Sequence, residues 1–238
     1  MTVRLLLATR SEHKLQELRT LLHLPWLELV SLDEAGVAGE AVEDAATFRG
    51  NAIIKARFYC GLSGMPTLAD DSGIEVDALG GAPGVYTRRF AGPDATDEQN
   101  NAKLLDELGD LPMERRRARY RCVLAFLDPR SQLVGGRPWV MTRSGTLEGR
   151  IAFAPHGTGG FGYDPIFEPL SELGSGRTVG EYTADEKNGI SHRARAAHAM
   201  ARYLKKRYPN QSRQGEADVR AVMRAPVRGG LVGPRDHS

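Results

Sequence analysis

The chain has 238 residues, of which 41% are hydrophobic and 26% are charged. This balance is that of an ordinary globular protein, and the chain is long enough to bury a substantial core. The formal net charge is +2, and the segment 211–238 accounts for it with five arginines and three acidic residues. Because residues 1–210 are neutral overall, composition excludes a broad basic face for nucleic acid.

Two further features of the sequence bear on the compartment. No stretch approaches the length of a membrane span, and the first strand-like run, residues 5–8, is too short for a secretory signal. Cys60 and Cys122 lie far apart and outside any zinc spacing, so we expect reduced thiols in the core. We therefore expect a cytoplasmic protein that binds no membrane.

Hydrophobic spacing predicts the elements in chain order. Strands are expected at 5–8, 27–32, 67–69 and 119–127, at 139–143 with a continuation through 146–151, and as a strand or turn at 163–167. Helices are expected at 12–23, from a Thr47 cap through residue 60, from a capping box of Thr96 and Gln99 to about residue 109, and at 192–208. Because the alternation is irregular, we predict an α/β fold with a mixed sheet.

The last segment differs from the rest in composition. Residues 211–238 contain four glycines, two prolines and no aromatic residue. Such a composition favours a disordered tail, with a short helix over residues 217–224 as the alternative. We therefore expect one domain over residues 1–210 and a disordered tail over 211–238.

A first candidate site lies where the first strand meets the first helix. Exposed backbone N–H groups and the positive end of a helix favour phosphate at such a junction. The alternative is an ordinary capped helix with a surface lysine. The residues concerned are Thr9, Arg10, Ser11, Glu12, His13 and Lys14.

A second candidate is the run Asp70-Asp71-Ser72-Gly73, which follows a short apolar strand. Two adjacent carboxylates repel each other unless they are solvated, hydrogen-bonded or neutralised by a cation. Mg²⁺ takes one or two carboxylates together with substrate phosphates. The alternative is a turn, for which Gly73 would supply the flexibility.

A third candidate is the glycine-rich segment 156–165, with four glycines in residues 157–162. Missing side chains leave room for a planar ligand or a phosphate, and Phe161 and Tyr163 can stack on a base. The spacing fits neither a Walker loop nor a dinucleotide-binding loop. A flexible loop with core aromatics is the alternative.

A fourth candidate, residues 186–193, places Lys187, His192 and Arg193 around the start of the last helix. This arrangement suits an anion or a carbonyl oxygen. A capped helix with surface cations is the alternative reading. His192 has no cysteine or histidine partner at zinc-ligand spacing.

Together these segments resemble the inosine/xanthosine triphosphate pyrophosphatases, over residues 3–204. The most specific motifs are Asn51-Ala52 with Lys55-Ala56, Ala69 to Gly73, Gly80-Gly81-Ala82-Pro83-Gly84, Gly157 to Pro165, and Ser191-His192-Arg193. The resemblance implies an elongated mixed sheet with flanking helices, and two lobes around a central nucleotide-binding cleft. It also implies a homodimer that uses Mg²⁺ to hydrolyse non-standard purine nucleoside triphosphates to monophosphate and pyrophosphate.

The resemblance also implies roles for individual residues. Asp71 matches the general base, and Glu43 and Asp71 match the magnesium site, with Asp70 as a supporting carboxylate. Ser72 matches a position beside the substrate. Phosphate contacts are implied for residues 9–14 and Lys55, and nucleotide contacts for Phe161, Gly162, Tyr163, Asp164, Lys187, His192 and Arg193.

Two positions depart from the family pattern. Ser11 stands where the family usually has asparagine, and Gly50 stands where an acidic residue usually precedes the Asn-Ala pair. We expect altered metal affinity or turnover, with more reliance on Glu43, Asp70 and Asp71. Two alternatives remain, namely a pyrophosphatase of modified pyrimidine nucleotides and a nucleotide-binding module without catalysis.

Overall fold

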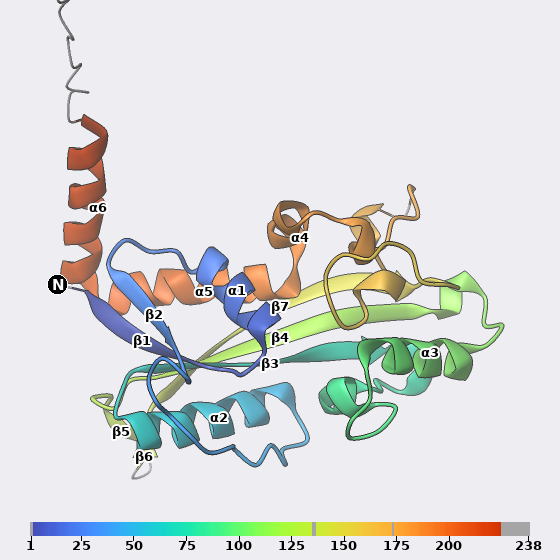
Figure 1. Cartoon of the computed structure of the whole chain (residues 1–238), viewed down its shortest axis with the longest axis horizontal. Helices are drawn as coiled ribbons and strands as arrows, with labels where there is room; N and C mark the ends of the chain where they lie inside the picture. Colours follow the sequence, from blue (N-terminus) through green and yellow to red (C-terminus); the bar gives the residue numbers. More distant parts are fainter. Residues whose placement is uncertain (1, 135–136, 173, 225–238) are drawn as a thin grey trace, which may run out of the picture.

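The computed structural model describes residues 2–134, 137–172 and 174–224. Its centre is a six-stranded mixed sheet with the order β2-β1-β3-β4-β7-β8, long in one direction (Figure 1). β1 pairs in parallel with β2 and β3, and the remaining neighbours are antiparallel. The strands are β1 (Val3–Ala8), β2 (Leu27–Ser31), β3 (Thr67–Val76), β4 (Arg117–Leu127), β7 (Val140–Ile151) and β8 (Phe167–Pro169), and a separate pair is formed by β5 (Leu133–Val134) and β6 (Arg137–Pro138). The predicted α/β class with a mixed sheet is confirmed.

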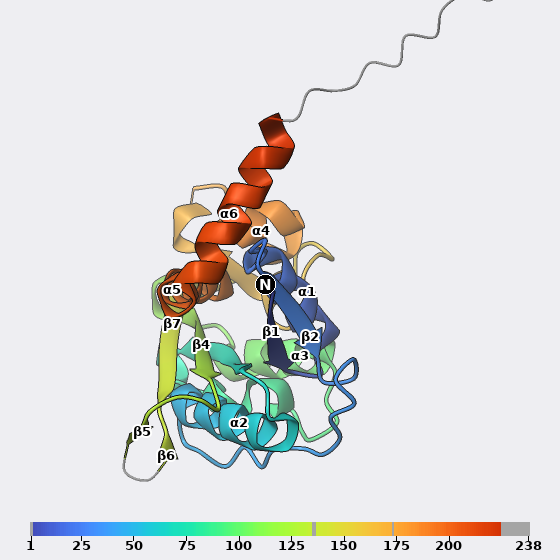
Figure 2. The same cartoon turned by 90° about the vertical axis from the view of Figure 1, so that its left-hand side faces the viewer.

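Helices cover both faces of the sheet (Figures 1 and 2). One face carries α1 (Glu12–Leu21), α4 (Ala184–Ile190) and α5 (His192–Arg207), and the other carries α2 (Phe48–Ser63). α3 (Asp97–Leu108) packs at the far end of β3, against Ile74 and Val76. One apolar cluster joins α1 and α5 to β1 and β4, and a second joins α2 to β1, β3 and β4. The predicted Thr47 cap and the capping box of Thr96 and Gln99 are both present. Cys60 and Cys122 are free and buried, as expected.

The prediction that the acidic pair follows a short strand was wrong. Asp70 and Asp71 lie inside β3, which continues to Val76 and pairs with β4 along its whole length. Gly73 is part of this strand and not of a turn. A Cβ at Gly73 would lie 2.3 Å from Thr87 Oγ1, so this glycine lets the segment after β3 approach the strand closely.

Other boundaries also differ from the prediction. Of the strand or turn expected at 163–167, the structure has the turn, a 3₁₀ turn at Asp164–Ile166, and the strand β8 begins only at Phe167. The short helix α4 was not predicted, although its capping box of Thr183 and Glu186 is visible in the sequence.

The end of the chain also departs from the prediction. The sequence predicts disorder from residue 211, but α6 (Pro209–Arg224) is helical and extends away from the sheet (Figure 2). Gly215 of α6 is buried against Trp26, where a Cβ would lie 3.1 Å from the indole. The rest of the predicted tail, residues 225–238, lies outside the described residues. No helix within the described ranges is both long and apolar enough to cross a membrane.

Candidate active site

The candidate site lies at an open edge of β3. β1 pairs with β3 only up to Ala8 and Ala69, after which the chain leaves the sheet toward α1. Further along the same edge, Ile74 N donates to Thr87 Oγ1. Between these points, residues 70–73 have no described strand beside them on this side. In open α/β sheets, ligands bind at the carboxyl ends of parallel strands, which is where this edge opens.

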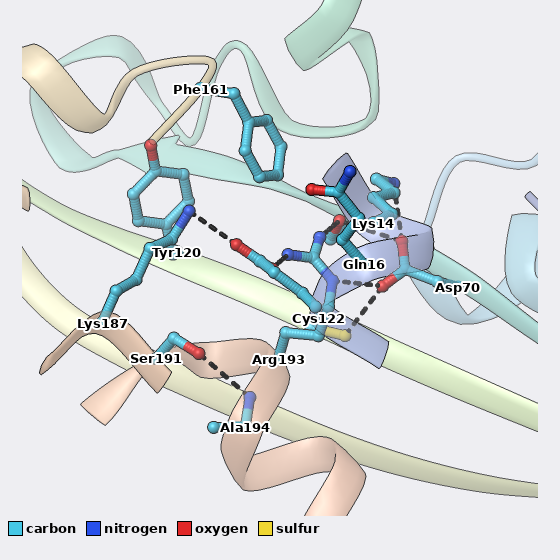
Figure 3. Close-up of polar contacts among 12 residues, drawn as sticks. Lys14, Gln16, Asp70, Tyr120, Cys122, Phe161, Lys187, Ser191, Arg193 and Ala194 are labelled. Carbon is cyan, nitrogen blue, oxygen red and sulfur yellow. Dashed lines mark hydrogen bonds and ion pairs between the residues drawn. The ribbon is translucent and has the colours of Figure 1, made fainter. Parts of the chain in front are cut away.

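Asp70 lies on the face covered by α1 and α5. Lys14 Nζ is 2.6 Å from its Oδ1, and Arg193 Nε is 3.1 Å from its Oδ2. Cys122 Sγ donates to the same carboxylate at 3.2 Å (Figure 3). Ser72 Oγ also donates to it, at 3.1 Å. Burial raises the pKa of Asp70, but the charges of Lys14 and Arg193 outweigh it and hold this pKa well below its usual range. Asp70 is therefore an ionised carboxylate whose oxygens are both occupied.

Asp71 points to the opposite face, because neighbouring residues of a strand alternate sides. Its Oδ1 lies 3.0 Å from Lys55 Nζ, which also contacts Glu43 Oε2 at 2.7 Å. Its Oδ2 is buried and has no hydrogen-bond partner. Burial raises the pKa of Asp71 to about 6, in spite of Lys55 and Lys14. Burial lowers the pKa of Lys55, but the negative charges of Asp71 and Glu43 raise it by more. The pKa of Lys55 is therefore raised.

The residues around Asp71 fit a magnesium ion. The unpartnered Asp71 Oδ2 and the half-buried Glu43 carboxylate are hard oxygen donors on either side of Lys55. Mg²⁺ is commonly held by one or two carboxylates and completed by substrate phosphates and water. Within the described residues, no group of three or more His, Cys, Asp or Glu side chains forms a metal cage. This face can therefore supply two carboxylates, but not a complete protein cage.

Arg193 begins a row of alternating charges that runs toward the glycine-rich segment. Glu17 pairs with Arg193 and, at 2.7 Å, with Lys187, which also lies 2.7 Å from Asp164 Oδ2. Burial raises the pKa of Glu17, but Arg193 and Lys187 outweigh it, and the pKa is lowered. Burial also raises the pKa of Asp164, which Lys187 offsets only in part. The row fixes two buried cations, Arg193 and Lys187, between Asp70 and the aromatic side chains of the glycine-rich segment.

Aromatic side chains lie at the far end of this row. Lys187 Nζ lies 4.3 Å from the ring centroid of Phe161. Behind it, Tyr120 stacks on His192 at 4.7 Å and donates to Asp164 Oδ1 at 3.1 Å. Burial, together with Arg193 and Lys187, holds the pKa of His192 well below its usual range, so the ring is neutral. His192 Nδ1 is buried without a partner. A flat ligand with polar edges fits this end.

Not all residues of the first candidate segment point into the site. The Arg10 guanidinium binds Asp33 and the carbonyls of Val37 and Gly39, so its donors are directed away from the open edge. Ser11 occupies the N-cap position of α1, but its side chain makes no cap hydrogen bond there. Thr9 Oγ1 accepts from Ser11 N at 3.2 Å. Glu12 is exposed.

The residues of the glycine-rich segment have different positions. Asp164 is buried and accepts from Phe161 N at 2.9 Å, so it shapes the loop. Tyr163 is buried and donates to Thr87 O at 2.9 Å. Gly162 N donates to Asp97 Oδ2. Of this segment, Phe161 is the aromatic residue placed beside the two cations.

Sequence reasoning missed Glu17 and Tyr120. Glu17 lies three residues after Lys14, and this spacing places both on one side of α1. Tyr120 belongs to the apolar face of β4 and has the pattern of a core residue. The partners of both residues lie more than 40 positions away in the chain, so only the fold brings them together.

Gly50, which stands where the family usually has an acidic residue, is closely packed against the loop before α2. A Cβ at Gly50 would lie 2.5 Å from Ala45 Cβ. A larger side chain at residue 50 would therefore require a shift of the loop before α2. In this chain, Gly50 is matched to its surroundings by packing.

Comparisons with known proteins agree with this geometry. A model of the Ham1 family matches residues 5–203. The dITP/XTP pyrophosphatase of Geobacter sulfurreducens is 45% identical over 201 residues, covering 84% of this chain and 96% of the relative. The dITP/XTP pyrophosphatase of Symbiobacterium thermophilum is 48% identical over 203 residues, covering 85% of this chain and 94% of the relative.

Solved structures give the same result. A HAM1 protein from Coxiella burnetii superposes with a TM-score of 0.76 and 37% identity, covering 86% of this chain and all of that one. The nucleoside-triphosphatase / dITP/XTP pyrophosphatase from Mycobacterium abscessus gives a TM-score of 0.67 and 40% identity, covering 83% and 98%. The resemblance indicated by the sequence motifs is confirmed: this chain belongs to the Ham1 family.

Proposed function

We propose that this protein hydrolyses the non-standard purine nucleoside triphosphates ITP, dITP and XTP to the nucleoside monophosphate and pyrophosphate. Relatives at 45% and 48% identity that are dITP/XTP pyrophosphatases support this substrate class. In the proposed reaction, a water oxygen bonds to the α-phosphorus, and the bond from that phosphorus to the bridging oxygen breaks. The reaction would cleanse the nucleotide pool, because the monophosphate product cannot be incorporated into nucleic acid.

The carrying observation is the carboxylate of Asp71. A general base works best with a pKa near the working pH, and burial raises the pKa of Asp71 to about 6. Its Oδ2 has no hydrogen-bond partner, and the two lone pairs of this oxygen allow it to face the magnesium ion and to accept a water proton. Lys55 holds the other oxygen at 3.0 Å and so fixes the orientation of the carboxylate. Asp71 is therefore the proposed catalytic residue.

Glu43 and Asp71 are the proposed magnesium ligands. When bound, Mg²⁺ would neutralise phosphate charge and polarise the reacting centre. Asp70 is left out of this set, because four donors already occupy its oxygens on the other face of the sheet. Lys14 and Lys55 would stabilise the charge of the phosphates and of the departing pyrophosphate.

The polar end of the site suits a purine with a carbonyl at C6. Arg193 and Lys187 are donors only, and hypoxanthine and xanthine offer an acceptor at C6 where adenine offers a donor. A site built from such donors rejects the wrong group strongly, because a mismatch leaves buried polar atoms unpaired. Because His192 is neutral, it can present a single N–H beside them. We also propose that the enzyme is a homodimer, which sedimentation of the purified chain tests, and that it is cytoplasmic, which cell fractionation tests.

The test is pyrophosphate release across a panel of nucleotides, with and without Mg²⁺. We expect ITP, dITP and XTP to exceed ATP, GTP and dTTP by at least about 100-fold in kcat/KM. Asp71→Asn should lose release by roughly 10²–10⁴-fold and still bind ITP. Asp44→Asn, an exposed acid in the loop that carries Glu43, is the matched control and should behave like the unchanged chain. Preference for methylated pyrimidine triphosphates, or binding of ITP without any release, would refute the proposal.

A further inference from the structure

We propose that His13 is a specificity-determining residue that stacks on the purine base and forms a wall of the base site opposite Phe161. The inference rests on the proposed function and assigns His13 a contact with the base in place of the phosphate contact that the sequence suggests. It starts from one pair of rings. The imidazole of His13 and the ring of Phe161 are stacked, with centroids 4.9 Å apart and planes inclined by 9°.

The two rings border a cavity of about 400 Å³, which is large enough for a purine. The cavity opens between the first two turns of α1, the glycine-rich segment and the start of α4. Glu17 and Lys187, which belong to the buried row of charges, also line it. The pair of rings therefore lies beside the buried donors that would read the edge of a base.

His13 and its neighbour Lys14 lie in the first turn of α1 and point toward different parts of the site. The next residue, Lys14, directs its ammonium group toward Asp70 at 2.6 Å, at the phosphate end. His13 instead lies against Phe161, on the side where the aromatic end of the site begins. Since a nucleoside triphosphate places its phosphates and base at opposite ends, the first turn of α1 can contact both.

The imidazole is free to move aside for a base. His13 is exposed, and its side chain makes no hydrogen bond to any described residue. Stacked bases are about 3.4 Å apart, so a base between two walls needs them about 7 Å apart. The observed 4.9 Å is too short. A rotation of the His13 side chain would open the space, and the ring contact between His13 and Phe161 would be replaced by two contacts with the base.

This exchange predicts the size of the effect. Base–aromatic stacking measured by alanine substitution corresponds to roughly 5- to 100-fold in affinity. Because removal of His13 also removes its competing contact with Phe161, we expect the lower part of that range. His13→Ala should raise KM for ITP about tenfold and change kcat by less than about twofold, since His13 lies away from Asp71.

The experiment compares His13→Ala, His13→Phe and the unchanged chain with two ligands. ITP carries a base, and inorganic tripolyphosphate, used as a competitive inhibitor, does not. His23→Ala is the matched control, because His23 is an exposed histidine just beyond the other end of α1. We expect KM for ITP to rise with His13→Ala, to return close to the original value with His13→Phe, and the inhibition constant of tripolyphosphate to stay unchanged throughout. Circular dichroism checks that each variant is folded.

Every other pattern overturns the proposal. An unchanged or lower KM for His13→Ala would mean that the imidazole does not stack on the base. Equal losses with ITP and tripolyphosphate would make His13 a phosphate contact. A loss with His13→Phe as large as with His13→Ala would point to a hydrogen bond of the imidazole. If the unchanged chain released no pyrophosphate from ITP, the proposed function would fail, and ITP binding by the same variants would still decide the role of His13.

Discussion

Replacing Asp70 by asparagine removes the charge on which the buried network at the α1 face depends. The Asp70 side chain is fully buried, and that of its partner Arg193 is only 1% exposed. Breaking a buried ion pair by removing one partner costs about 3–5 kcal/mol. Arg193 keeps Glu17 as a second partner, and the partly exposed Lys14 can reach water. We therefore expect Asp70→Asn to lower the free energy of unfolding by about 3 kcal/mol at neutral pH.

The measurement is urea unfolding followed by circular dichroism. A domain of this size loses about 2–4 °C in melting temperature for each kcal/mol, so a shift of roughly 6–12 °C should accompany the change. Asp33→Asn is the matched control, since Asp33 pairs with Arg10 but its side chain is 83% exposed. It should cost less than about 0.5 kcal/mol. A cost below about 1 kcal/mol for Asp70→Asn would show that this network contributes little to stability.

The same variant gives a pH signature. The folded pKa of Asp70 lies below its unfolded value near 4, so its contribution is fully present above that value. The contribution is lost as the pH falls from about 4 toward the folded pKa. The unchanged chain should therefore lose stability in acid more steeply than Asp70→Asn, and the two curves should converge. Parallel curves over this range would refute the assignment of an ionised Asp70.

Three further outcomes follow from the geometry. Gly145→Ala should lower the free energy of unfolding in urea by about 1–3 kcal/mol and raise KM for ITP. The reason is that the new Cβ would lie 2.1 Å from the backbone oxygen of His192, at the start of α5. An unchanged stability and an unchanged KM would contradict this close packing. Arg10→Ala should leave KM for ITP within about twofold, because its donors face away from the site, and a tenfold rise would restore a phosphate role. At low, sub-saturating Mg²⁺, kcat/KM should fall as the pH drops below about 6, because protonated Asp71 cannot accept a proton, and raising Mg²⁺ should move this acid limb to lower pH; the absence of an acid limb at low Mg²⁺ would exclude Asp71 as the base.

Local signals in the sequence determined the elements and much of the site. The caps at Thr47 and at Thr96 with Gln99 form within a few residues of chain, so they can be read directly. The apolar alternation of β4 likewise follows from its own residues. Motif identity then singled out Asp71, Lys55 and the run from Ser191 to Arg193, which the fold places around one open edge.

Only the tertiary structure shows how the environments of Asp70 and Asp71 differ. Asp70 and Asp71 look equivalent in the sequence, but the strand continues through them and sends them to opposite faces. Arg193 and Lys14 then keep Asp70 ionised and occupied, while burial beside Lys55 raises the pKa of Asp71 to about 6 and leaves one oxygen free. These differences depend on charges that are distant along the chain and close in space. The motif therefore pointed to Asp71 without a physical reason, and the fold supplied that reason, because it gives the two carboxylates opposite faces and different partners.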